Sequence, residues 1–228
     1  MQSEADTCRK FVLPNLYAAG WTDDQIAEQR SFTDGRIIVQ GNRAFRKAGK
    51  RADYLLRYTR DQYLAVVEAK PEDQAAAAGL QQAKDYAQIL GLKFAYATNG
   101  REILEFDFLT GIERLVETFP TPAELWSRLR GGYKLTSDSA AQRLLTPANL
   151  TTGKEPRYYQ RIAIDRAVQA IVQGKKRVLL TMATGTGKTV VAFQICWKLW
   201  SSKWNAKGDP TRKPRILYLA DRNFLVDD

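Results

Sequence analysis

Short apolar runs separated by polar turns dominate the first half of the chain. Five of these runs have the length and residue types of β-strands, at about 36–39, 53–58, 62–70, 93–98 and 102–109. Residues 3–19 and 72–90 have helical spacing instead, and Pro14 is expected to bend the first of these helices. Asn99-Gly100 lies between the last two runs and is a strong hairpin signal. The pattern predicts an α/β domain with a mixed sheet flanked by helices.

The pattern changes within residues 131–155, where the chain is rich in Gly and Ser and has no apolar period. We place a domain boundary there and expect domains at 1–145 and 146–228. Beyond the boundary, an amphipathic helix opens near Gln160, and a buried β-type segment at 178–181 runs through a Gly-rich turn into an apolar helix. The pattern in this second part predicts an α/β unit distinct from the first domain.

Charge and composition restrict the chemistry. The chain has 228 residues, with 35 Lys and Arg against 25 Asp and Glu, a net charge of +10 and a pI near 9.6. Such a surface suits a polyanion, with nucleic acid as the leading interpretation and a solvated basic surface as the alternative. The absence of histidine excludes Ser-His-Asp and Cys-His hydrolases and histidine-ligated metals. Catalysis would therefore depend on carboxylates and lysine, with or without a hard metal ion.

Cysteine use and hydropathy set the expected compartment. Cys8 and Cys196 lie far apart, which offers neither a zinc-ligand spacing nor a disulfide framework. There is no run of about 18 apolar residues and no secretory start, so we expect no membrane association. The cytoplasm is the predicted location.

The run YLAVVEAK carries the first candidate site. Strand alternation places Glu68 and Lys70 on the same face. If the loop is centred on Arg60-Asp61, paired positions sum to 121 and Asp53 lies opposite Glu68, whereas a three-residue loop would break this register. Two carboxylates about 4.5–5.5 Å apart repel each other, so a cation is expected between them. Lys70 supplies part of that positive charge, and a Mg²⁺ ion fits the gap between the carboxylates better. The alternative is that these residues lie at the end of a hairpin that has emerged into solvent.

These residues resemble a nuclease family. Asp53, then a strand that closes with Glu68 and Lys70, then a helix that carries Gln82 and Tyr86, is similar to the PD-(D/E)xK nucleases with an added QxxxY motif. The resemblance implies that Asp53 and Glu68 bind metal and that Lys70 is catalytic. It implies that Gln82 and Tyr86, which share one helical face, support the site.

Two further positions bear on this resemblance. Glu4 in the first helix matches a glutamate often found in these nucleases, which would make it a further metal ligand. Ala52 stands before Asp53 where the family motif has proline. Without the preceding strand, an ordinary core edge would be the better interpretation of Gln82 and Tyr86.

The second motif, MATGTGKT, indicates nucleotide binding. Gly185 and Gly187 allow backbone amides to close round phosphates, Lys188 would meet the β and γ oxygens, and Thr189 could bind Mg²⁺. The strict pattern has Gly or Ala at the position of Met182, but the stretch resembles motif I of superfamily 2 helicases. The predicted ATP-binding residues in this loop are Thr184, Gly185, Thr186, Gly187, Lys188 and Thr189.

The segments on either side of this loop resemble further helicase motifs. Gln160 is similar to the glutamine that reads the adenine edge, and Arg157 or Tyr158 could stack on the base. A packed aromatic residue at the start of a helix is the alternative for Tyr158. Downstream, ILYLADRNFLVDD resembles motif Ia, a strand and turn in which Arg222 would contact the DNA backbone.

A nuclease followed by a helicase motor is the layout of the restriction subunit of type I restriction enzymes. The resemblance implies an N-terminal fragment in which a RecA-like P-loop domain is incomplete, with Asp227 and Asp228 at its end, so no ATP turnover is expected from this piece. It implies Mg²⁺, ATP, double-stranded DNA, and methylation (M) and specificity (S) subunits as partners. The alternative is a DNA-binding motor module whose nuclease-like domain does not cleave.

Overall fold

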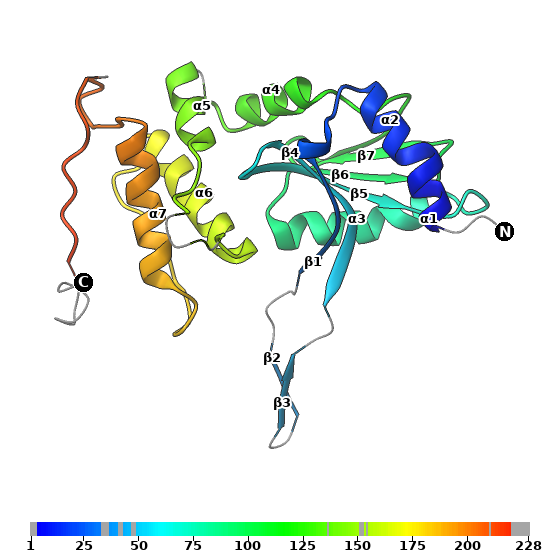
Figure 1. The fold of residues 1–228 in the computed structure, drawn as a ribbon, viewed down its shortest axis with the longest axis horizontal. Helices are drawn as coiled ribbons and strands as arrows, with labels where there is room; N and C mark the ends of the chain where they lie inside the picture. The colour runs from blue at the N-terminus through cyan, green and yellow to red at the C-terminus, as the bar shows by residue number, and fades with distance from the viewer. Residues whose placement is uncertain are drawn as a thin grey trace.

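The computed structural model describes residues 4–32, 37–40, 43–46, 49–135, 137–150, 153, 155–209 and 211–219. A six-stranded sheet has the order β1-β4-β5-β6-β7-β8, and β2 and β3 form a separate hairpin that stands away from it (Figure 1). Within the large sheet β5 and β6 are parallel, and every other neighbouring pair is antiparallel. The mixed α/β architecture predicted from the sequence is confirmed.

The bounds of the elements are as follows. The strands are β1 (Ile26–Phe32), β2 (Ile37–Gln40), β3 (Arg43–Arg46), β4 (Lys50–Thr59), β5 (Gln62–Ala69), β6 (Phe94–Thr98), β7 (Ile103–Asp107) and β8 (Ile112–Val116). The helices are α1 (Glu4–Thr7), η1 (Cys8–Val12), α2 (Leu13–Ala18), η2 (Asp23–Gln25), α3 (Ala77–Leu90), α4 (Pro122–Gly132), α5 (Asp138–Leu145), α6 (Tyr158–Val172) and α7 (Lys188–Ser201). The predicted strands correspond to β2, β4, β5, β6 and β7, whereas β1, β3 and β8 were not predicted.

Helices cover both faces of the sheet. On one face α3 packs its alanines against Val66 and Ala95, and on the other the N-terminal helices and α4 bury Val67 and Tyr96 (Figure 1). Because both faces are covered, β5 is buried from Leu64 through Ala69. The charged side chain of Glu68, near the end of β5, is therefore held inside the protein and does not emerge into solvent, whereas Lys70 just beyond the strand is partly exposed.

The predicted helix at 3–19 forms, with a π-helical turn in its middle. The backbone N–H of Leu13 donates to the carbonyl of Cys8, five residues back, and Pro14 follows at once. Proline has no N–H to donate and its ring crowds the carbonyl four residues earlier, so a widened turn ahead of it relieves the clash. The expected bend of the helix axis at Pro14 stays a prediction.

The hairpin register predicted from YLAVVEAK is confirmed. Positions that sum to 121 pair across β4 and β5, as Tyr54 with Val67, Leu55 with Val66, and Leu56 with Ala65. The two-residue connection at Arg60 and Asp61 closes this hairpin, with one irregularity near Arg57. The same register continued by one pair brings Asp53 beside Glu68.

The predicted start of the second helix was wrong. Helix α3 begins at Ala77 and not at 72, because the preceding residues form turns, in which the N–H of Gln74 donates to the carbonyl of Pro71. The side chain of Asn99 then donates to the carbonyl of Gln74 at 2.8 Å and fixes these turns against the β6–β7 connection. The helix ends as predicted, at Gly91 in the left-handed region.

The segment that we expected to be without periodic structure contains a helix. Ser137 caps α5 by accepting a hydrogen bond from the N–H of Ala140 at 3.2 Å, and Ala141 and Leu144 bury one side of it. The helix is only 8 residues long, so its short apolar stripe was masked by the surrounding Gly and Ser. Helices α5, α6 and α7 pack against one another beside the sheet (Figure 1).

Two predicted strands in the second part are absent. Residues 178–181 and 216–219 are extended but unpaired, and Leu179, Leu217 and Leu219 are 90%, 83% and 82% exposed. A strand needs a neighbour for its backbone hydrogen bonds, and none of the described residues pairs with either segment. The helix after the Gly-rich turn, α7, does form. Within the described residues no helix is both long and apolar enough to cross a membrane.

Candidate functional site

Asp53 and Glu68 lie side by side on the α3-facing side of the sheet. Asp53 is 8% exposed and Glu68 is 1% exposed. The Asp53 carboxylate accepts a hydrogen bond through Oδ2 from the backbone N–H of Ala69 at 2.9 Å. This contact fixes one oxygen of Asp53 against the end of β5, next to Glu68.

The side chain of Gln82 joins the other predicted residues into one hydrogen-bonded group. Its Nε2 donates to Glu68 Oε2 at 2.8 Å and to the Tyr86 hydroxyl at 3.2 Å. Its Oε1 accepts from Lys70 Nζ at 3.2 Å. One turn earlier in α3, a Cβ on Gly79 would lie only 3.2 Å from the carbons of Lys70, so this glycine leaves room for the lysine chain.

The electrostatics of the group favour a bound cation. Burial, together with the negative charge of Asp53, raises the pKa of Glu68 to about 8. Burial and Asp53, with which it hydrogen-bonds, likewise raise the pKa of Glu4. The second Glu68 oxygen, Oε1, is buried and has no hydrogen-bond partner among the described residues. A positive ion would satisfy this oxygen and relieve the repulsion between the carboxylates.

The donor set fits a hard divalent metal ion in particular. Carboxylate oxygens are the ligands that Mg²⁺ prefers, and the ion is commonly held by one or two carboxylates, with waters and phosphate oxygens completing its shell. Within the described part of the chain, no group of three His, Cys, Asp or Glu side chains is arranged to hold a metal by itself. The arrangement is consistent with two protein carboxylates and a shell that substrate completes.

Gln29 is a residue of this site that the sequence did not reveal. Its Nε2 donates to Asp53 Oδ1 at 3.2 Å, so both oxygens of Asp53 are held by protein donors. The β1–β4 ladder pairs the residues on either side of Gln29 but omits Gln29 itself, whose φ is +49°. A left-handed backbone is strained for a residue other than Gly, Asn or Asp. A polar residue in an unpredicted strand carries no signal that could have identified it.

The Gly-rich loop of the second part precedes α7 as predicted. Gly185 and Gly187 have φ of +74° and +81°, the left-handed conformation that glycine permits. The Lys188 ammonium donates to the carbonyls of Met182 and Ala183, both at 3.3 Å. The loop therefore curls round the lysine at the N-terminus of a 14-residue helix, where backbone N–H groups can receive phosphate.

Gln160 contacts this loop directly. Its Nε2 donates to the carbonyl of Thr186 at 2.8 Å, and its Oε1 accepts from the N–H of Arg157 at 2.8 Å. An amide has two N–H groups and two acceptor lone pairs, so one of each remains for another partner such as adenine. Thr184 and Thr189 are exposed on the loop.

The two candidates for stacking on adenine have other neighbours. The Tyr158 ring packs edge-on against Phe32 of β1 at 6.5 Å, and the Arg157 guanidinium donates to the Tyr159 hydroxyl at 3.1 Å. Tyr158 therefore lies toward the sheet domain. Arg222, Asp227 and Asp228 lie outside the described residues.

Comparison with known proteins relates both halves of the chain to restriction-enzyme subunits. The family model described as "Type III restriction enzyme, res subunit" matches residues 153–228. The EcoAI type I restriction enzyme endonuclease subunit of Escherichia coli is 41% identical over 99% of this chain. A solved fragment assigned as an HsdR subunit of a type I restriction enzyme from Vibrio vulnificus YJ016 is 59% identical, with a TM-score of 0.84 over 94% of this chain. The chain is a homologue of type I restriction endonuclease subunits.

The homology covers a limited part of those subunits. The chain spans 28% of the EcoAI subunit and 41% of the Vibrio vulnificus chain. The EcoKI endonuclease subunit of Escherichia coli strain K12 is 44% identical, over 30% of this chain and 5% of its own length. The comparisons therefore do not assign to this chain the activities that depend on the rest of such a restriction subunit.

Proposed function

We propose that this chain carries the DNA-cleaving centre of a type I restriction subunit, a PD-(D/E)xK nuclease, followed by the first part of its ATP-driven motor. The observation that carries the proposal is the paired, buried carboxylates of Asp53 and Glu68, joined through Gln82 to Lys70 and Tyr86. A buried carboxyl without a partner for one oxygen costs stability, and function is the usual reason for such a cost.

Asp53 and Glu68 would hold the metal, and Glu4 would approach it from α1. When bound, Mg²⁺ would supply charge neutralisation at the scissile phosphate and would lower the pKa of a coordinated water. Gln29 and the Ala69 N–H keep the Asp53 carboxylate in one orientation, so the site needs little rearrangement to receive the ion.

Lys70 acts on the phosphodiester from the same end of β5. An ammonium has three donors, and the bond to Gln82 uses one of them. The other two can hold an attacking water and a phosphate oxygen in line for hydrolysis. The amine could take a proton from that water only after losing one of its own. Gln82 and Tyr86 set the direction of the lysine through the hydrogen bonds described above.

The second part would bind ATP at the loop 184–189 and near Gln160, and contact double-stranded DNA through Arg222. We divide the chain at 1–145 and 146–228, as the sequence predicts. In the complete subunit the motor would translocate DNA, with methylation and specificity subunits as partners in the cytoplasm. The RecA-like assignment rests on the Gly-rich loop before α7 and on the family match over residues 153–228.

The test is cleavage by the complete restriction complex that carries Lys70→Ala. We expect DNA cleavage to fall by at least about 100-fold, within the range that one catalytic proton-transfer group contributes, while DNA-stimulated ATP hydrolysis continues. Lys207→Ala removes the same charge from an exposed position and should cleave normally. Wild-type cleavage by Lys70→Ala would refute the nuclease assignment and favour a motor module that only grips DNA.

A further inference from the structure

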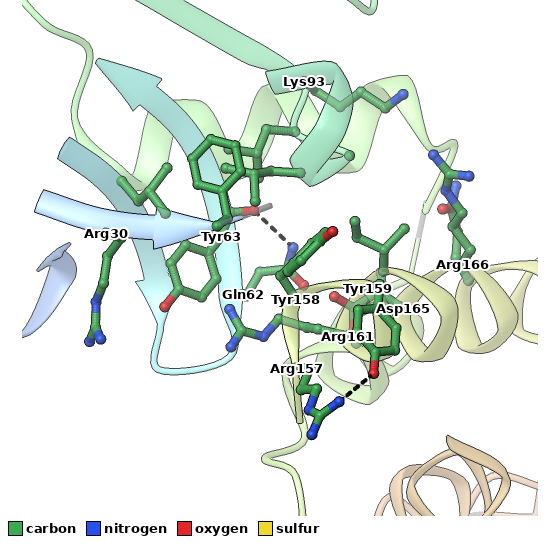
Figure 2. A pocket seen from close by; sticks show the side chains of 18 of the residues that line it. Arg30, Gln62, Tyr63, Lys93, Arg157, Tyr158, Tyr159, Arg161, Asp165 and Arg166 are labelled. Atoms are coloured by element: carbon green, nitrogen blue, oxygen red, sulfur yellow. Dashed lines mark hydrogen bonds between the residues drawn. The ribbon is translucent and has the colours of Figure 1, made fainter. Parts of the chain in front are cut away.

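A cavity of about 700 Å³ lies where α6 meets the sheet domain (Figure 2). Its walls come from β1, the start of β5, the C-terminal end of α3, and α6. None of the proposed metal-site residues and none of the residues of the Gly-rich loop lines it. Arg157 and Tyr158, the two candidates for stacking on adenine, do line it, so the cavity adjoins the predicted ATP site without sharing its phosphate loop. Its volume lies within the range of small-molecule pockets.

Positive charge surrounds this cavity. Its cationic lining residues are Arg30, Lys93, Arg157, Arg161 and Arg166. In Figure 2, Arg30 lies on the strand side, and Lys93 and Arg166 lie on other sides of the hollow. Within the described part of the chain, the charged groups of Arg30, Lys93 and Arg166 form no ion pair, so they can receive a ligand.

The two acids in the lining do not cancel this charge. Glu155 pairs with Arg60 at 2.6 Å, and Asp165 lies 3.7 Å from the buried ammonium of Lys198. Neither Arg60 nor Lys198 lines the cavity, so each acid is offset by a cation from outside the lining. The space therefore has an excess of positive charge, which favours an anion.

Aromatic rings form the surface between the cations. Tyr63, Tyr158 and Tyr159 lie between the labelled charges in Figure 2. Phe32, also in the lining, packs edge-on against Tyr158. The Arg161 guanidinium lies over the Tyr63 ring at 4.4 Å from its centroid, so cation and aromatic ring already pair in this wall. Proteins that bind unpaired nucleic acid combine aromatic rings, on which bases stack, with a basic groove that holds the backbone.

We propose that this cavity binds a nucleotide unit, with the base against the tyrosine rings and the phosphate between the arginines. The unit could belong to a free nucleotide or to an unpaired stretch of a DNA strand, since both present the same base and phosphate. The site links the two parts of the chain. Phe32 in its wall contacts the ring of Tyr86 at 5.1 Å, and the Tyr159 hydroxyl donates to the carbonyl of Thr186 in the Gly-rich loop at 3.4 Å.

The experiment measures binding of a fluorescent oligo(dT) of about 12 nucleotides to the 228-residue chain by anisotropy, in EDTA and without ATP. Arg30→Gln combined with Arg166→Gln should weaken binding by at least about 10-fold and reduce the salt dependence, because two phosphate contacts are removed. Both arginines are exposed, so the fold should be preserved. Lys207→Gln with Arg215→Gln removes the same charge from exposed positions elsewhere and should leave binding unchanged.

Two further measurements sharpen the test. Lys188→Ala disables the Gly-rich loop and should leave oligo(dT) binding intact, because Lys188 does not line the cavity. Displacement of the oligonucleotide by millimolar dTMP would identify a free nucleotide as the ligand, and failure of dTMP to compete would identify a DNA strand. Binding that the Arg30 and Arg166 pair leaves unchanged, or that the control pair or Lys188→Ala weakens equally, would overturn the proposal. Because no readout is cleavage or ATP turnover, this result is independent of the proposed enzymatic function.

Discussion

Replacing Glu68 with glutamine should make the metal-free protein less sensitive to alkaline pH. The pKa of Glu68 is raised from 4.5 to about 8 by burial and by the neighbouring charge of Asp53. The folded state therefore keeps this proton to a higher pH than the unfolded chain does. Stability from the protonated group is complete below pH 4.5 and is lost as the pH rises through about 8.

The size of the effect follows from the shift. One pKa unit corresponds to about 1.4 kcal/mol, so raising the pH from 5 to 8 should lower the free energy of unfolding of the wild type by about 3 kcal/mol through this group. Glutamine cannot ionise and can still accept the hydrogen bond from Gln82 Nε2. Any packing cost of the substitution is independent of pH, so it cancels when differences at two pH values are compared.

The assay is denaturant unfolding in EDTA at several pH values between 5 and 8, followed by circular dichroism. Glu105→Gln is the matched control. Burial acts to raise the pKa of Glu105, but hydrogen bonds from Arg128 and Tyr96 outweigh it and hold that pKa below its usual range. Glu105 is thus ionised in both states above pH 5.5, and its variant should differ from wild type by a constant amount. A constant difference for Glu68→Gln as well would refute this account of the site.

Two other predictions concern neighbouring contacts. Gln29→Ala in the complete restriction complex should raise the Mg²⁺ concentration needed for half-maximal cleavage by about 10-fold, because Asp53 loses an orienting donor. Cleavage at saturating Mg²⁺ should change less. An unchanged Mg²⁺ requirement would show that Gln29 does not contribute to the metal site. Gln160→Ala in the complete motor should weaken ATP several-fold more than GTP, because only the adenine contact is removed. Equal weakening of the two nucleotides would assign Gln160 to holding Thr186 alone.

Local signals in the sequence were sufficient to predict the strand pairing at the centre of the sheet. The turn at Arg60-Asp61 and the alternation of β5 determine the register, so the pairing that brings Asp53 to Glu68 follows from the sequence alone. The four-residue spacing of Gln82 and Tyr86 likewise predicts that their side chains lie together on one face of α3. These features depend on contacts within one hairpin or one helix.

Features that depend on distant segments could not be predicted. The apolar residues near Leu179 and Leu217 have strand-like composition, yet strand formation requires a partner that no described segment provides. Gln29 reaches Asp53 only because β1 lies beside β4. No sequence pattern indicates the left-handed backbone conformation of Gln29. The cavity beside α6 likewise arises from packing between segments far apart in the chain.

The most direct test of the central claim is a crystal structure of the protein soaked in Mn²⁺, with the metal located by its anomalous scattering. We expect one peak at ligand distance, about 2.0–2.3 Å, from a carboxylate oxygen of both Asp53 and Glu68, with Glu68 Oε1 as one of the ligands. No peak between these carboxylates, with Asp53 and Glu68 still bonded only to their protein partners, would contradict it.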